Sequence, residues 1–275
     1  MMQESGDNTA NRMNGRRDSL RDRLLVAIPV FNEEKYLERV IDDVRKFADH
    51  LLVVDDGSTD ATPELLKKLA GRSEPNELHV ITHPENRGYG KSLADAFCFA
   101  RKRGYEWLIT MDCDEQHDAA CIPRFMQAAR LDEADIISGT RYPANREVDV
   151  EVPQDRRSIN RALTELINAR LSFEITDAFC GFKAYRVSTL FNFDISVPGY
   201  AMPMQFWVQA ARADLRVGEM PVPLIYDDPT RHFGGLLDDP AVRLSHYLDV
   251  FLQELGAGEV RDGDGDKSDG WMSCR

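Results

Sequence analysis

Short apolar runs alternate with amphipathic segments along the first half of this 275-residue chain. Residues 24–28, 51–54 and 78–82 each have the length and apolar character of a buried strand. Apolar side chains between the first two runs recur at helical spacing, which predicts a helix with one buried face. This alternation predicts an α/β fold with a mainly parallel sheet. We expect Pro29 to stop the first strand and Asn32 to cap the first helix.

The same alternation continues along the second half of the chain. Strands are predicted over 107–111, 135–139, 179–185 and 217–226, and helices over 122–131, 158–171 and 204–213. Pro221 and Pro223 favour an edge position for the last strand, because proline cannot donate a ladder hydrogen bond. We expect one domain over residues 24–255, preceded by a disordered leader (1–23) and followed by a disordered acidic tail (256–275).

Composition narrows the classes of partner and compartment. The chain has 47 acidic and 34 basic residues, a formal charge of −13, which argues against nonspecific binding to nucleic acid. No run approaches the roughly 18 apolar residues of a membrane span, and the N-terminus lacks the apolar centre of a secretory signal. The five cysteines show neither CxxC nor His-paired spacing. We expect a cytoplasmic protein that is soluble or peripheral at a membrane.

Acidic clusters follow two of the predicted strands. Asp55 and Asp56 come directly after one apolar run, and Asp112 and Asp114 come after another. The carboxyl ends of parallel strands share one edge of the sheet, where open α/β sheets bind ligands. Carboxylates, together with the amide oxygen of Gln116, are hard donors suited to Mg²⁺ or Mn²⁺. The pattern predicts a metal-bridged nucleotide site.

Four motifs occur in an order and spacing that resemble the family-2 glycosyltransferases. They occupy residues 26–34, 53–60, 86–91 and 112–117. The similarity spans roughly residues 24–235 and is greatest to the dolichyl-phosphate mannosyltransferase and polyprenyl-phosphate glucosyltransferase branch. It implies a GT-A (Rossmann-like) domain with a nucleotide-sugar-binding half (24–142) and an acceptor-binding half (143–255).

The resemblance also implies roles on the donor side of the site. The residues expected to hold the nucleotide base, ribose and diphosphate are Pro29, Asn32, Glu33, Asp56, Lys91, Asp112, Arg156 and Arg157. Asp112 and Asp114 would frame Mg²⁺ or Mn²⁺, and Gln116 would complete the metal site. His117 is expected to support this loop by hydrogen bonding rather than to bind the metal.

On the acceptor side, basic residues would face phosphate. Arg141 ends a predicted strand and, by resemblance, faces the acceptor phosphate or the donor diphosphate. Asp177 is the candidate general base for an acceptor that must lose a proton. Arg231 would clamp the diphosphate, although the serine-lysine pair that follows this arginine in relatives is missing. With Asp114, these three residues form the catalytic set.

The sequence leaves three functions in competition. The first is metal-dependent, inverting transfer of a hexose from GDP-mannose or UDP-glucose to a polyprenyl or dolichyl phosphate at a membrane surface. The second is transfer to a hydroxyl of a glycan or small molecule, which would require a base. The third is nucleotide-sugar binding without turnover. The sequence does not select the donor, and it leaves homo-oligomer formation open.

Overall fold

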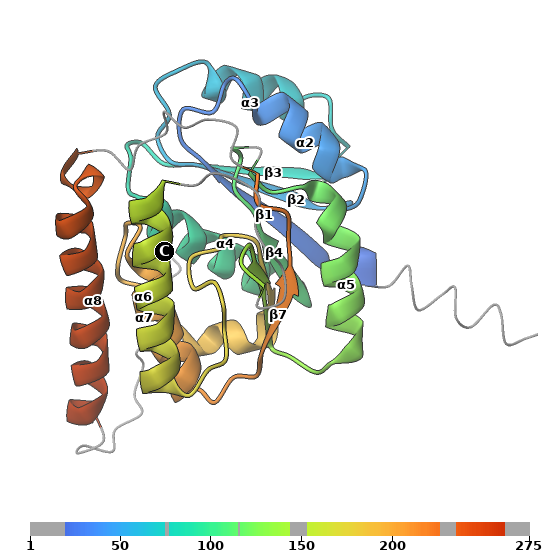
Figure 1. Ribbon diagram of the computed structural model, residues 1–275. Helices are drawn as coiled ribbons and strands as arrows, with labels where there is room; N and C mark the ends of the chain where they lie inside the picture. The colour runs from blue at the N-terminus through green and yellow to red at the C-terminus, as the bar shows by residue number, and fades with distance from the viewer. Residues whose placement is uncertain (1–19, 75–76, 115, 144–152, 226–234, 262–275) are drawn as a thin grey trace, which may run out of the picture.

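The computed structural model describes residues 20–74, 77–114, 116–143, 153–225 and 235–261, without side-chain detail for 258–261 (Figure 1). Its strands are β1 (Leu24–Val30), β2 (Leu51–Asp55), β3 (Leu78–Thr82), β4 (Trp107–Thr110), β5 (Ile136–Thr140), β6 (Lys183–Arg186) and β7 (Val217–Pro221). They form one seven-stranded sheet in the order β3-β2-β1-β4-β6-β5-β7. Only β6 runs antiparallel to its neighbours, β4 and β5. The predicted α/β domain with a mainly parallel sheet is confirmed.

Helices cover both faces of the sheet (Figure 1). They are α2 (Leu37–Arg45), α3 (Thr62–Ala70), α4 (Tyr89–Arg103), α5 (Ile122–Leu131), α6 (Gln154–Leu171), α7 (Met202–Arg212) and α8 (Pro240–Arg261). Three short 3₁₀ segments are η1 (Ala119–Cys121), η2 (Val187–Asn192) and η3 (Gly235–Asp238). Val26 and Ile28 of β1 belong to the core beneath α2, α3 and α5. Leu25 and Ala27 belong to the core beneath α4, α6, α7 and α8. Burial on both faces explains why the central strand is apolar without interruption.

The boundary predicted after β1 is wrong. The strand continues through Pro29, which lies opposite Val54 of β2. Ala27, two residues earlier, bonds toward β4 by accepting from Met111 N at 3.1 Å. The nitrogen of Pro29 is on the side of β1 that faces β4, just beyond the last residue pair of these two strands. Proline has no N–H, but at this position the sheet needs none, so no hydrogen bond of the sheet is lost.

Asn32 does not cap the first helix. Its backbone lies in the left-handed region with φ of 57°, and helix α2 begins only at Leu37 after Tyr36. The side-chain oxygen of Asn32 instead accepts a hydrogen bond from Thr59 N at 2.8 Å. Asparagine tolerates this conformation and fastens the loop after β1 to the loop after β2.

The second half departs from prediction at its ends. β6 begins at Lys183, because residues 179–182 form an irregular segment rather than a strand. β7 lies at the sheet edge as predicted. Helix α8 was not predicted and runs to Arg261, past the boundary placed at residue 255, while residues 262–275 lie outside the described chain. Leu20, assigned to the leader, is buried in the core. Within the described residues, no helix combines the length and apolar character that crossing a membrane requires.

Candidate active site

A cavity of about 590 Å³ opens at the carboxyl ends of the parallel strands. The segments after β1, β2, β4 and β5 contribute to its wall, together with residues of α4, α6, α7 and α8. Carboxylates lining it include Asp112 and Asp114, and cations lining it include Arg141, Arg156 and Lys183. The sheet therefore brings both predicted acidic clusters and part of the predicted basic set to one hollow.

Two hydrogen bonds and one glycine determine the position of Asp112. Tyr89 donates its hydroxyl to Asp112 Oδ1 at 3.2 Å. The backbone N of Asp112 donates to Nδ1 of His117 at 2.9 Å, so His117 supports the loop as predicted. A Cβ added at Gly181 would lie 2.6 Å from Asp112 Oδ2, far closer than van der Waals contact allows. Gly181 therefore provides the space that the Asp112 carboxylate occupies.

The residues after β4 fit a divalent cation. Asp112, Asp114 and Gln116 all line the cavity, and Asp114 Oδ1 accepts from Gln116 N at 3.2 Å. Burial raises the pKa of Asp112, an energetic cost that a bound cation would reduce. No three His, Cys, Asp or Glu side chains among the described residues form a complete metal cage. Mg²⁺ and Mn²⁺ sites that share phosphate oxygens and water need only one or two carboxylates, so the donor set fits.

Asp56 also lines the cavity, and its carboxylate is fixed by backbone donors. Its Oδ1 accepts from Arg87 N and its Oδ2 from Gly88 N, both at 2.8 Å. Pro29 and Glu33 line the same cavity, as the resemblance implies. Asp56 is only 4% exposed, so its position is set by the loops after β2 and β3.

Three residues expected at the nucleotide do not line the cavity: Asn32, Lys91 and, as described below, Arg157. Asn32 is bonded to Thr59, as described above. Lys91 forms an ion pair with Asp95 on the same helix, α4. Residues four positions apart on a helix are neighbours on its surface, so this ion pair could have been predicted from the sequence.

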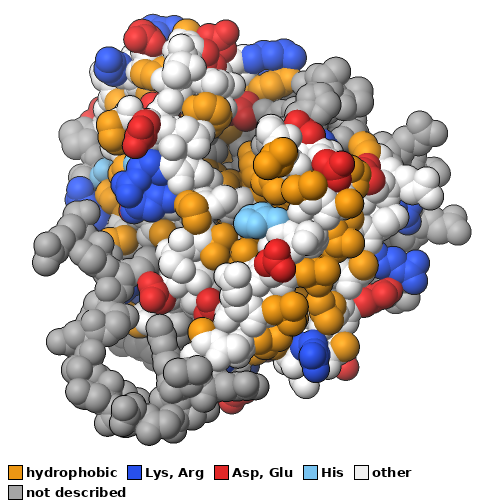
Figure 2. Space-filling model, turned by 90° about the vertical axis from the view of Figure 1, so that its left-hand side faces the viewer, with side chains coloured by type: hydrophobic (Ala, Val, Ile, Leu, Met, Phe, Trp, Pro, Cys, Tyr) orange, Lys and Arg blue, Asp and Glu red, His pale blue; other side chains and the backbone are white. Residues whose placement is uncertain are grey.

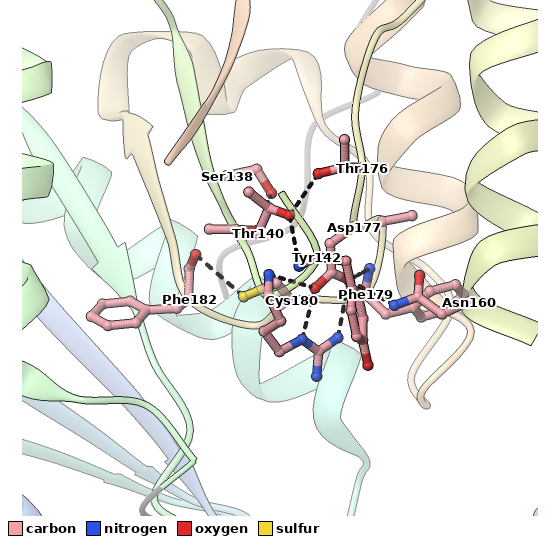
Figure 3. A network of polar contacts seen from close by, with 12 residues as sticks. Ser138, Thr140, Tyr142, Asn160, Thr176, Asp177, Phe179, Cys180 and Phe182 are labelled. Carbon is pink, nitrogen blue, oxygen red and sulfur yellow. Dashed lines mark hydrogen bonds and ion pairs between the residues drawn. The ribbon is translucent and has the colours of Figure 1, made fainter. Parts of the chain in front are cut away.

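Arg141 and Asp177 form a buried bidentate ion pair, and Figure 3 shows Asp177 within its network of polar contacts. Arg141 Nε donates to Asp177 Oδ2 at 2.7 Å, and Nη2 donates to Oδ1 at 3.0 Å. Asn160 Nδ2 and Phe179 N add donors to Oδ1 at 2.8 and 3.2 Å. Burial alone would raise the pKa of Asp177, but Arg141 and Asn160 outweigh it and hold that pKa well below its usual range.

A second layer of contacts holds this pair in place. Glu219 of β7 accepts from Thr176 N at 2.8 Å and from Asp177 N at 3.2 Å. Thr176 and Thr140 bond to each other through their hydroxyls at 2.6 Å (Figure 3). These contacts connect β5, β7 and the turn before β6, so the guanidinium of Arg141 has a fixed position.

The remaining predicted cations differ in their positions relative to the cavity. Arg156 lines the cavity, whereas Arg157 lines a neighbouring groove and lies over the ring of Tyr142. Arg231 lies outside the described residues. Arg156 and Arg157 are one residue apart on α6, so their side chains point to different faces of the helix.

Two cavity cations were not singled out from the sequence. Lys183 is only 5% exposed and donates from Nζ to the carbonyl of Cys180, and burial lowers its pKa. Arg243 of α8 is 2% exposed and bonds to Asp155 of α6 at 2.5 Å. Lys183 falls within the strand predicted over 179–185 and was within reach of the sequence. Arg243 was not, because its helix was unpredicted.

The fold matches those of solved glycosyltransferases. Glucosyl-3-phosphoglycerate synthase from Mycobacterium tuberculosis aligns with a TM-score of 0.65 and 17% identity, over 92% of this chain and 86% of that chain. This likeness establishes the GT-A class of fold. Residues 25–191 match the family described as Glycosyl transferase family 2. The chain belongs to glycosyl transferase family 2 and is a glycosyltransferase, as the sequence motifs indicated.

Relatives with similar sequences are transferases that act with polyprenol phosphates, according to their names. The undecaprenyl-phosphate mannosyltransferase of Micrococcus luteus is 28% identical over 232 residues, covering 82% of this chain and 93% of that protein. The polyprenol monophosphomannose synthase of Mycolicibacterium smegmatis is 30% identical over 205 residues, covering 73% of this chain and 76% of that protein.

Proposed function

We propose that this chain transfers a hexose from GDP-mannose or UDP-glucose to a polyprenyl or dolichyl phosphate, with Mg²⁺ or Mn²⁺. One observation carries the proposal. A single cavity is lined by the Asp112 and Asp114 carboxylates and by the fixed Arg141 guanidinium. Carboxylates suit a metal–diphosphate donor, and a fixed guanidinium suits an acceptor phosphate. The names of the polyprenol-phosphate relatives support the same pairing.

On the donor side, the protein binds and orients the nucleotide sugar. Asp112, Asp114 and Gln116 would hold the cation, which when bound offsets negative charge on the departing diphosphate. Asp56 and Glu33 provide acceptors for the nucleoside within the same cavity. This division of roles follows from the order of the strands, because residues after β2 and β4 lie on either side of β1.

On the acceptor side, Arg141 has further donors outside its ion pair. Asp177 accepts one N–H from Nε and one from Nη2, so the pair does not use the two N–H groups of Nη1 or the second one of Nη2. A guanidinium held this way binds phosphate oxygens with little further loss of side-chain freedom. Arg156 and Lys183 add positive charge to the same cavity.

The setting of Asp177 favours a phosphate acceptor over a hydroxyl acceptor. Both of its oxygens accept hydrogen bonds and its pKa is low, so it is a weak base. A phosphate oxygen is already an anion and needs no base to attack the anomeric carbon. A single displacement, with the acceptor opposite the departing diphosphate, would invert the anomeric configuration.

The α8 side of the molecule suits a lipid acceptor. The cavity wall there includes Ile159, Phe179 and Tyr247, which form an apolar boundary near Arg156. Figure 2 shows this side of the molecule, where apolar side chains are exposed among charged ones. Leu236 of η3 is 81% exposed. A polyprenyl chain leaving the cavity would meet these groups, which supports peripheral membrane association.

Calorimetry of the full chain with UDP-glucose and with GDP-mannose tests the donor half of this proposal. We expect one donor to bind with Mn²⁺ and to lose affinity with chelator or in Asp114→Asn. Asp42→Asn on the exposed face of α2 is the control and should bind as the wild type does. Failure of both donors to bind would contradict the donor assignment. Binding without transfer to any acceptor would favour a non-catalytic binding protein.

A further inference from the structure

Four side chains form a continuous ionic chain from helix α4 to the nucleotide side of the cavity. His83 Nδ1 lies 2.6 Å from Asp56 Oδ1, and His83 Nε2 lies 2.8 Å from Asp95 Oδ2. Asp95 also pairs with Lys91 through its other oxygen. The order is therefore carboxylate, imidazole, carboxylate, ammonium. Asp56 is the member that lines the cavity.

The geometry of this chain determines the protonation of His83. Ionised carboxylates accept hydrogen bonds and do not donate them, so each ring nitrogen must supply a proton to its own partner. A neutral imidazole carries only one such proton and would direct a lone pair at the other carboxylate. The side chain of His83 is 5% exposed, so water does not relieve that repulsion. With both carboxylates ionised, the form of the ring that donates to both of them is the imidazolium.

The groups around His83 are consistent with a positive ring. His83 follows β3, Asp56 follows β2, and Asp95 and Lys91 belong to α4. The two carboxylates contact the ring directly, while Lys91 contacts only the far oxygen of Asp95. Two anions therefore flank the ring, and the four members alternate in charge with a net charge of zero.

We propose that His83, as a doubly protonated imidazolium, is a positioning residue that fixes the Asp56 carboxylate for the donor nucleotide. This inference rests on the proposed function, in which Asp56 contacts the nucleoside. The backbone N–H groups of Arg87 and Gly88 donate to Asp56 from the segment just before α4. His83, directly after β3, contacts the same carboxylate. Lys91 and Asp95 act through His83. Lys91 therefore supports donor binding without approaching the diphosphate.

The charge state of His83 can be read directly by nuclear magnetic resonance. The full-length protein, labelled with ¹⁵N-histidine, is studied at pH 7.5, and His83→Gln assigns the His83 signals. We expect both ring nitrogens of His83 to carry protons. One protonated and one unprotonated nitrogen would overturn the proposal. Because the protonation of the ring is read from the wild-type spectrum, this readout does not depend on any nucleotide.

Donor binding gives the second readout. Glutamine at position 83 is neutral and carries its donors on a single nitrogen, so it cannot bridge the two carboxylates as the two ring nitrogens do. We therefore expect His83→Gln to weaken binding of UDP or GDP about tenfold. The kcat at saturating donor should change less than threefold, because His83 does not touch the reacting atoms. His79→Gln is the control: it lies on the same strand, β3, but its ring packs on Phe99 at 4.9 Å. It should bind nucleotide as the wild type does.

The outcomes separate this inference from the proposed function. Wild-type protein that binds neither nucleotide contradicts the proposed function, while the histidine spectrum still decides the charge of His83. Equal nucleotide affinity in wild type and His83→Gln contradicts the positioning role alone. Should His83→Gln fail to fold, Asp95→Asn replaces it, since this change leaves Asp56 intact and removes the second carboxylate at the ring. We expect Asp95→Asn to give a neutral His83 at pH 7.5, and an unchanged imidazolium would overturn the account.

Discussion

Arg141 and Asp177 meet through two hydrogen bonds of 2.7 and 3.0 Å, with the carboxylate wholly buried. The pair crosses from the end of β5 to the turn before β6, two segments 36 residues apart in sequence. Two parallel bonds fix both the position and the plane of the guanidinium. A guanidinium held in this way suits the acceptor phosphate that we propose above.

Arg141→Lys tests whether the guanidinium itself is required. Lysine keeps the charge but has no planar fork, so we expect kcat/KM for lipid phosphate to fall about a hundredfold. Donor affinity should change less than threefold. Arg161→Lys, at an 80% exposed arginine of α6, is the control and should keep full activity. Wild-type transfer rates in Arg141→Lys would remove Arg141 from the acceptor site.

Asp177→Asn tests the energetic role of the pair. The substitution leaves Arg141 charged and without its buried partner, so we expect the free energy of unfolding to fall by about 3–5 kcal/mol. Urea denaturation measures this change. Arg141→Met combined with Asp177→Asn should recover part of the loss, since it removes the uncompensated charge. A double variant less stable than Asp177→Asn would contradict this explanation.

Gly181→Ala tests the space beneath Asp112. The added methyl group would lie 2.6 and 2.9 Å from the two Asp112 oxygens and would displace the carboxylate. We expect the concentration of Mn²⁺ for half-maximal activity to rise at least about tenfold, as is typical when support of a metal ligand is lost. Gly256→Ala, where a Cβ meets nothing within 4 Å, is the control. An unchanged requirement for Mn²⁺ would contradict the proposal that the position of the Asp112 carboxylate matters for metal binding.

Asp135 makes the free energy of unfolding depend on pH in the acid range. Hydrogen bonds from Arg216, together with its charge and a hydrogen bond from Arg186, overcome burial and lower the pKa of Asp135 to about 2. The unfolded value is about 3.9, so the folded state is favoured above that pH and this contribution is lost as pH falls toward 2. We expect wild type to exceed Asp135→Asn in free energy of unfolding at pH 5, with the gap closing by pH 2.5. A gap independent of pH would contradict the assignment.

Local pattern was sufficient to place the carboxylates that we propose for the donor side at one cavity. Asp112 and Asp114 follow a continuous apolar run, and the ends of parallel strands must share an edge of the sheet. The arrangement of β1, β2 and β4 follows from the same pattern. Asp56 and Asp112 could therefore be placed near one cavity from sequence alone.

The support around the site depends on pairings distant in sequence. Arg243 and Asp155 are 88 residues apart, and no local pattern predicts their contact. His83 lies between Asp56, 27 residues earlier, and Asp95, 12 residues later. Asp177 had the residue type of a base, but its partner Arg141 makes it a weak one. Residue type alone does not show which side chains have partners.

Transfer of labelled hexose to a polyprenyl phosphate in detergent tests the central proposal most directly. The wild-type chain is assayed with UDP-glucose and GDP-mannose, with Mn²⁺ or chelator, alongside Asp114→Asn. We predict a lipid-linked hexosyl phosphate from one donor, with inverted anomeric configuration, and no product with chelator or in Asp114→Asn. Product formed on a free sugar or small-molecule hydroxyl, with none on the lipid phosphate, would contradict the proposed acceptor.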